Sequence, residues 1–146
     1  GLDDCDTTPL TTYYKKTEEI DTILRESDYV SVNLPLLPST RHIINDHAFE
    51  IMKPTSMLIN VARGPIVDEQ ALYSALKERK IACAACDVFE QEPLPEESPL
   101  WDLDNIMITS HKSGMGDSWT TLIGQLIERN MHHYLANEPL ENVIRL

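Results

Sequence analysis

The chain has 146 residues, of which 42% are hydrophobic and 25% are charged, as is usual for one globular domain. Its formal net charge of −12 argues against nucleic acid or an anionic membrane surface as the main partner, because both attract basic proteins. There is no signal-peptide pattern, and no apolar run approaches the roughly 18 residues that mark a membrane-spanning helix. We therefore expect a cytoplasmic protein.

Apolar segments with the period of a helix alternate with short apolar runs that are typical of buried strands. Asn45 and Asp68 precede two of the helical segments, where short polar side chains satisfy free backbone N–H groups. We expect helices after Thr17 and at 46–52, 69–79 and 118–136, and strands at 29–34, 57–61, 81–88 and 105–109. This alternation predicts an α/β fold, with a parallel sheet, helices on both of its faces and a long C-terminal helix.

Each predicted strand has a distinctive group at its carboxyl end. These groups are the Leu34-Pro35 turn, the guanidinium of Arg63, the carboxylate of Asp87 and the imidazole of His111. The carboxyl ends of parallel strands share one edge, and open α/β sheets bind ligands at that edge. Glu92 lies on the loop just after Asp87. A cation, an imidazole and a carboxylate at one crevice suit acid–base chemistry on an anionic substrate.

Four segments occur in an order that is shared with a known family: NVARGPIVD (60–68), DVFEQEPLP (87–95), SPLWDLDNI (98–106) and HKSG (111–114). They resemble the D-isomer-specific 2-hydroxyacid dehydrogenases, which include phosphoglycerate dehydrogenases, glyoxylate/hydroxypyruvate reductases and D-lactate dehydrogenases. The resemblance extends from about Asp28 to Leu146. It implies a partial Rossmann-like sheet and hydride transfer between NAD(H) and a small 2-hydroxy acid/2-keto acid pair. It also implies a homodimer for the full-length protein.

The resemblance implies three catalytic residues. Arg63 matches the arginine that holds the substrate carboxylate and carbonyl, and a planar guanidinium suits an α-keto carboxylate. His111 matches the general acid/base that protonates the carbonyl oxygen during reduction. Glu92 matches the acid that pairs with this histidine and favours its charged form.

The resemblance also implies a set of cofactor contacts. Asp87 matches the residue that contacts the nicotinamide carboxamide, and Asp3 matches the acidic residue that accepts from the adenosine ribose hydroxyls. No arginine follows Asp3, so NAD is favoured over NADP. The full set of cofactor-binding residues is Asp3, Leu34, Pro35, Thr40, Val61, Ala62, Arg63, Asp87, His111 and Gly114.

The chain departs from the family because no G-x-G-x-x-G motif opens it. Gly114-Met-Gly116 mimics the start of that motif, but Trp119 at its third position is too bulky for a phosphate loop. We expect residues 1–116 to be the C-terminal part of an NAD-binding domain. Residues 117–146 would be an inter-domain helix and tail that pack on a missing substrate domain. The apolar stripe that begins at Trp119 would then be an exposed patch or an oligomer contact.

The cysteines and the remaining histidines have structural interpretations. Cys83 and Cys86 form a C-x-x-C pattern, but residues three apart in a strand point to opposite faces, so core packing is predicted and no metal site. The histidines outside the predicted site are expected at the surface: His42, His47, His132 and His133.

The alternative to an enzyme is a truncated, catalytically silent half-Rossmann module that acts only in protein association through an unpaired sheet edge. The chain begins with glycine and its first residues look mid-domain, so we expect a fragment of a longer protein. Without the glycine-rich loop, we expect the 146-residue chain alone to bind NADH poorly. A strand followed by G-x-G-x-x-G upstream of Gly1 would favour the enzyme.

Overall fold

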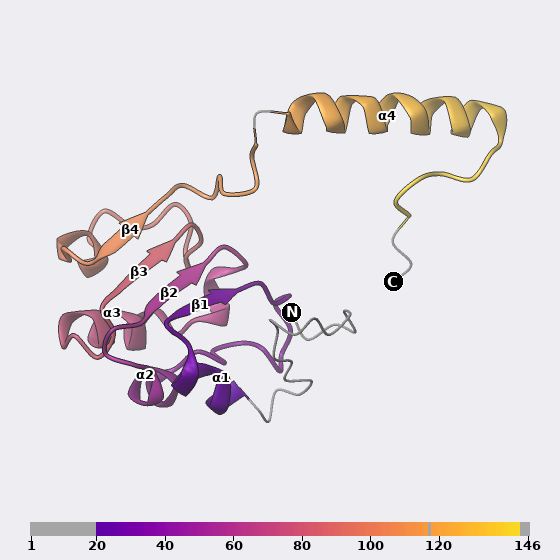
Figure 1. Ribbon diagram of the computed structural model, residues 1–146. Coiled ribbons are helices and arrows are strands. Elements are labelled where there is room, and N and C mark those ends of the chain that lie inside the picture. Colours follow the sequence, from indigo (N-terminus) through magenta and orange to yellow (C-terminus); the bar gives the residue numbers. More distant parts are fainter. Residues whose placement is uncertain (1–19, 117, 144–146) are drawn as a thin grey trace. The chain divides into compact units, whose positions relative to one another are not determined.

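A computed structural model describes residues 20–116 and 118–143, which divide into two compact units between Lys112 and Ser113 (Figure 1). The first unit is an α/β sheet and the second is a helix with a folded tail. Each unit is described by itself below.

The sheet of the first unit contains four parallel strands in the order β1-β2-β3-β4. Its elements, in chain order, are α1 (Ile20–Glu26), β1 (Tyr29–Val32), α2 (Asp46–Ile51), β2 (Met57–Asn60), η2 (Gly64–Ile66), α3 (Glu69–Lys77), β3 (Cys83–Cys86), η3 (Pro99–Asp102) and β4 (Ile106–Ile108). The last residues of neighbouring strands are paired: Val32 with Asn60, Asn60 with Cys86, and Cys86 with Ile108. The expected α/β parallel sheet is therefore confirmed, and its carboxyl ends are level at one edge.

The helices of this unit lie on one face of the sheet rather than on both (Figure 1). Helix α2 packs against both α1 and α3, so the three helices form one layer. The strand order is the reason, because right-handed crossovers that always advance in the same direction place every helix on the same side. Burial alternates accordingly along β1, where Val30 and Val32 are buried and Tyr29 and Ser31 are exposed. We expected helices on both faces of the sheet, but the described helices cover one face only.

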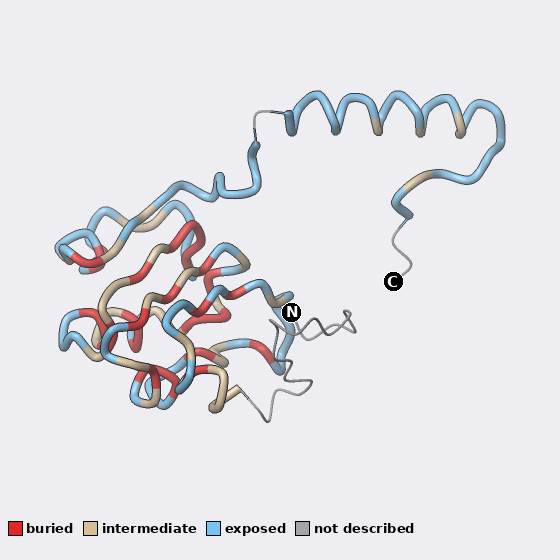
Figure 2. The backbone as a smooth tube through the Cα atoms, viewed as in Figure 1, coloured by how far each residue is buried: buried red, intermediate tan, exposed pale blue. Residues whose placement is uncertain are grey.

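The core lies between the sheet and this helical layer, where buried segments are concentrated (Figure 2). Its largest fully buried apolar side chains are Phe49, Leu24, Leu58, Ile66, Leu76, Ile81 and Leu100. The two expected caps are confirmed. The side chain of Asn45 accepts from Ala48 N, and the side chain of Asp68 accepts from Gln70 N and Ala71 N. These caps fix the helix starts and hence the loops that leave the carboxyl edge.

The second unit consists of α4 (Trp119–Ala136) and a tail that folds back along it. The helix ends at Asn137, which adopts the left-handed conformation at φ 57°. Arg129 Nη2 donates to Glu141 Oε2 at 3.0 Å, and the Asn130 side chain exchanges hydrogen bonds with the backbone of Glu141. No described residue of α4 is buried, so its apolar stripe, which begins at Trp119, is exposed (Figure 2). None of the described helices is both long and apolar enough to cross a membrane.

Candidate active site

Two cavities open at the carboxyl edge of the sheet. The first has a volume of about 590 Å³ and lies at the ends of β1 and β2. Its lining residues are Asn33, Leu34, Pro35, Leu36, Val61, Ala62 and Arg63. The second has a volume of about 790 Å³ and lies at the ends of β3 and β4. It is lined by Asp87, Glu92 and His111 together with an apolar wall that includes Phe89, Leu94 and Trp101.

A short hydrogen bond joins the two predicted acid–base residues of the second cavity. His111 Nδ1 and Glu92 Oε2 lie 2.7 Å apart. An ionised carboxylate can only accept, so Nδ1 carries the proton and donates. The other carboxylate oxygen of Glu92 accepts from Phe89 N at 3.0 Å. Because both oxygens are engaged, Glu92 holds the imidazole in one orientation and leaves Nε2 for another partner.

The pKa of the Glu92 carboxyl lies below its ordinary value of 4.5. Partial burial raises this pKa, and so does the negative charge of Asp87. The hydrogen bonds from His111 and Phe89, together with the charge of His111, lower it by more. Glu92 is therefore ionised, and able to accept from the imidazole, at any pH near neutrality.

Asp87 fixes the backbone that carries His111. Its carbonyl oxygen accepts from His111 N at 2.9 Å, and its buried carboxylate accepts from Thr109 Oγ1 and from Lys112 N. His111 itself has φ 55°, a left-handed conformation that is uncommon for a residue with a side chain. Such backbone conformations are held by surrounding contacts and cluster at active sites.

Arg63 lines the other cavity and does not pair with Glu92 or His111. Its Nη1 donates to the neighbouring Ala62 O at 2.6 Å, and no described carboxylate forms an ion pair with it. The loop that carries Arg63 is held by the buried Asn60, whose side chain accepts from Ala62 N and donates to Arg63 O. The guanidinium is thus exposed at the same sheet edge as the Glu92–His111 pair, with N–H groups available to a ligand.

Five of the ten predicted cofactor residues line the first cavity: Leu34, Pro35, Val61, Ala62 and Arg63. Thr40 lines neither of the two cavities. It is buried and points into its own loop, where its hydroxyl donates to Pro35 O at 2.7 Å and accepts from Leu37 N at 2.8 Å. Asp87 and His111 line the second cavity. Gly114 belongs to the second unit, and Asp3 lies outside the described residues.

Several residues that shape the site were not among the predicted ones. Asn60 is a polar residue at the end of an otherwise apolar strand, which is the sequence signal that could have identified it. Gly64 lies so close to the 87–92 loop that a Cβ atom there would overlap the carbonyl group of Phe89. Thr109 had no signal, because its partner Asp87 is 22 residues away along the chain.

The cysteines lie as predicted, on alternate faces of β3, with Cys83 half-buried and Cys86 buried. Both are free thiols. Within the part of the chain that the structure describes, no three His, Cys, Asp or Glu side chains are grouped to hold a metal ion.

The parallel sheet with its helical layer is the Rossmann-type fold of solved 2-hydroxyacid dehydrogenase family proteins. The chain belongs to the D-isomer specific 2-hydroxyacid dehydrogenase family, because it matches the model of the family's NAD binding domain over residues 4–113. It is 45% identical over 120 residues to a glyoxylate reductase of Thermofilum pendens, an alignment that covers 82% of this chain and 35% of that protein. The chain spans well under half of the length of the curated relatives compared with it.

Solved structures agree in fold. A D-isomer specific 2-hydroxyacid dehydrogenase from Xanthobacter autotrophicus Py2, in complex with NADPH and MES, is 41% identical with a TM-score of 0.75 and covers 88% of this chain and 52% of its own. A D-lactate dehydrogenase with NAD⁺ from Lactobacillus jensenii is 28% identical with a TM-score of 0.78 and covers 86% of this chain and 42% of its own. The family resemblance inferred from the sequence is confirmed.

Proposed function

We propose that the protein containing this chain transfers hydride between NAD(H) and C2 of a D-2-hydroxy acid/2-keto acid pair. The observation that carries this proposal is the 2.7 Å hydrogen bond between Glu92 and His111 at the sheet edge. In the direction of reduction, a 2-keto acid, NADH and one proton become a 2-hydroxy acid and NAD⁺. The nicotinamide, when bound, supplies the hydride, and His111 Nε2 donates the proton to the carbonyl oxygen.

Arg63 and Glu92 have supporting roles in this proposal. The free N–H groups of Arg63 bind the substrate carboxylate in a bidentate manner and so orient the carbonyl. Glu92 keeps the proton of His111 on Nδ1 in the neutral imidazole and stabilises the charged form before proton donation. The chain thereby aligns a carboxylate receptor and a proton donor at one edge, and this alignment is the protein's part in hydride transfer.

The first cavity fits part of a dinucleotide. Its volume of about 590 Å³ is within the usual range for ligand sites, and apolar Leu34, Pro35 and Val61 line it beside backbone groups. We assign the adenosine and pyrophosphate side to this cavity and the carboxamide contact to Asp87. Thr40 acts here by fixing the Pro35 loop, while the roles of Asp3 and Gly114 stay predictions.

The proposal also covers the cofactor preference, the C-terminal segment and the assembly of the protein. We favour NAD over NADP because an acidic residue, Asp3, is followed by no arginine; relatives have been solved with NADPH and with NAD⁺. Residues 117–146 are proposed as the inter-domain helix and tail of a cytoplasmic homodimer. The ratio of kcat/KM for NADH to that for NADPH tests the cofactor preference, and a ratio below one would reverse it.

The experiment that tests the function is an assay of the protein containing this chain with NADH and a panel of small 2-keto acids, comparing the unaltered protein with His111→Gln. We expect NADH oxidation by the unaltered protein, a loss of at least about 10²-fold in kcat for the variant, and a similar Kd for NADH by fluorescence titration. His47→Gln, at an exposed histidine bonded to Asp21, is the control. No turnover by the unaltered protein would favour the silent association module instead.

A further inference from the structure

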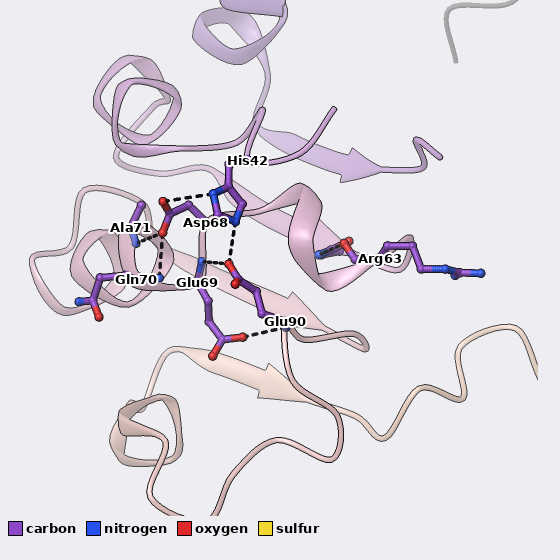
Figure 3. A network of polar contacts seen from close by, with 8 residues as sticks. His42, Arg63, Asp68, Glu69, Gln70, Ala71 and Glu90 are labelled. Carbon is purple, nitrogen blue, oxygen red and sulfur yellow. Dashed lines mark hydrogen bonds and ion pairs between the residues drawn. The ribbon is translucent and has the colours of Figure 1, made fainter. Parts of the chain in front are cut away.

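A cluster of four residues lies outside the two cavities of the candidate site and takes no part in the proposed chemistry. It consists of His42, Asp68, Glu69 and Glu90, and we refer to it as the His42 cluster (Figure 3). His42 Nε2 lies 2.9 Å from Glu90 Oε1, and His42 Nδ1 lies 3.8 Å from Asp68 Oδ2. The cluster lines a separate cavity of about 340 Å³, and Figure 3 shows the Arg63 guanidinium pointing away from it.

The cluster joins three segments that are far apart in the chain. His42 lies between β1 and α2, Asp68 and Glu69 begin α3, and Glu90 lies on the loop after β3. Glu90 Oε1 accepts from Glu69 N at 3.3 Å, and Glu90 N donates to Glu69 Oε2 at 3.1 Å. One carboxylate oxygen of Glu90 therefore caps the first turn of α3 and also binds His42.

The same segments carry the candidate site residues. His42 N donates to Pro65 O at 2.9 Å, two residues beyond Arg63. Glu90 is two residues before Glu92. Between them, Gly64 packs directly against the backbone of Phe89 and Glu90. The loop of Arg63 and the loop of Glu92 are thus in direct backbone contact. The His42 cluster adds side-chain hydrogen bonds between the same two segments.

The titratable groups that line the cavity of the His42 cluster are mainly acidic. Asp68, Glu69 and Glu90 are three carboxylates, and of the described titratable groups that line this cavity only Tyr73 and His42 are not acidic. Burial raises the pKa of Glu69; a hydrogen bond from the backbone of Glu90 lowers it, and the charge of Glu90 raises it further. Among these carboxylates, the His42 imidazole donates to Glu90 Oε1 at 2.9 Å.

Resting on the proposed function, we propose that His42 and Glu90 are positioning residues, which hold the Glu92–His111 pair in register with Arg63. Loss of their contact frees the 87–92 loop to move against the Arg63 loop. A small misplacement of catalytic groups reduces rate steeply, because the geometry of attack depends on sub-ångström alignment. Glu90→Ala removes the shared acceptor, whereas Glu90→Gln keeps a carbonyl oxygen that accepts from the same two donors.

The test compares His42→Ala, Glu90→Ala, Glu90→Gln and the double variant H42A/E90A in the protein containing this chain. His47→Ala is the matched control, since His47 forms a similar bond to Asp21 between α1 and α2. We expect kcat with a 2-keto acid to fall about tenfold in His42→Ala and at least as much in Glu90→Ala, which also removes the acceptor of Glu69 N. The double variant should fall no further than Glu90→Ala, because that variant already lacks the contact with His42. We expect Glu90→Gln to keep most of the rate and His47→Ala to keep all of it.

A second measurement does not depend on activity. The Cε1–H and ring-nitrogen NMR signals of His111 report on its contact with Glu92, and we expect them to shift or broaden in Glu90→Ala and to stay unchanged in Glu90→Gln and His47→Ala. If the unaltered protein lacks turnover, the proposed function fails, and these signals still decide the positioning role. An unchanged His111 signal in Glu90→Ala, or rates within about twofold of His47→Ala, would overturn the proposal.

Discussion

His111 Nδ1 donates to Glu92 Oε2 over 2.7 Å, and this bond connects the loop after β4 to the loop after β3. The left-handed backbone at His111 aims the imidazole, and Glu92 then determines which ring nitrogen is the donor. Phe89 N holds the second oxygen of Glu92, so the carboxylate cannot rotate to serve another partner without losing a bond. The pair is therefore preorganised before any substrate arrives.

Replacement of this carboxylate should be costly. In Glu92→Gln the side chain carries no charge and cannot stabilise a protonated imidazole, so we expect kcat for 2-keto acid reduction to fall by about 10²-fold. The Kd for NADH should change little, because Glu92 does not line the first cavity. Steady-state kinetics and fluorescence titration measure the two effects. Glu96→Gln, on the same acidic loop but not lining the second cavity, is the control and should behave like the unaltered protein.

The lowered pKa of Glu92 predicts a pH-dependent contribution to stability. Because the folded pKa lies below 4.5, the unfolded chain binds more protons between that lowered value and 4.5. The contribution is therefore present above about pH 4.5 and is lost as pH falls through the folded pKa. Urea unfolding at several pH values should show the unaltered protein gaining stability over Glu92→Gln as pH rises through this interval. A constant difference between the two proteins would contradict the assignment.

Much of the fold follows from local pattern. The caps at Asn45 and Asp68 and the strand that leads to Arg63 depend on neighbours in sequence, and the structure places all of them as expected. The one-sided helical layer depends on strand order, which periodicity does not encode. The sequence pattern indicates apolar strands but not the direction in which successive crossovers advance.

The candidate site was predicted in part for the same reason. Glu92 and His111 each lie within a continuous sequence motif, so the pair could be identified from a family pattern. The role of His42, in contrast, depends on two partners 26 and 48 residues away, so an isolated histidine was interpreted as a surface residue. It is half-buried and bridges two carboxylates. Contacts between loops that meet only in the folded chain leave no local signal.

Gly64 should tolerate no side chain. An alanine Cβ would overlap the carbonyl group of Phe89 and lie 2.5 Å from Glu90 N, and these are backbone atoms that cannot rotate away. We expect Gly64→Ala to lower the free energy of unfolding by about 1–3 kcal/mol, as overpacking does, and to lower kcat by displacing the 87–92 loop. Thermal unfolding and kinetics test this. Gly124→Ala is the control, because nothing lies within 4 Å of its added Cβ, and equal stability of the two variants would refute the steric argument.

Cys86 should be chemically inert in the folded protein although it belongs to a C-x-x-C pattern. Burial raises the pKa of its thiol to about 12, and the negative charge of Glu69 adds to this shift. Since the thiolate is the reactive form, only about one in 10⁴ molecules would carry it at pH 8. Iodoacetamide followed by peptide mass spectrometry should therefore leave Cys86 unmodified in the native protein and modify it in urea. Cys83, half-buried on the opposite face of β3, is the internal comparison. Alkylation of Cys86 as fast as Cys83 under native conditions would show that β3 opens to solvent, and that the edge carrying Asp87 is not rigid.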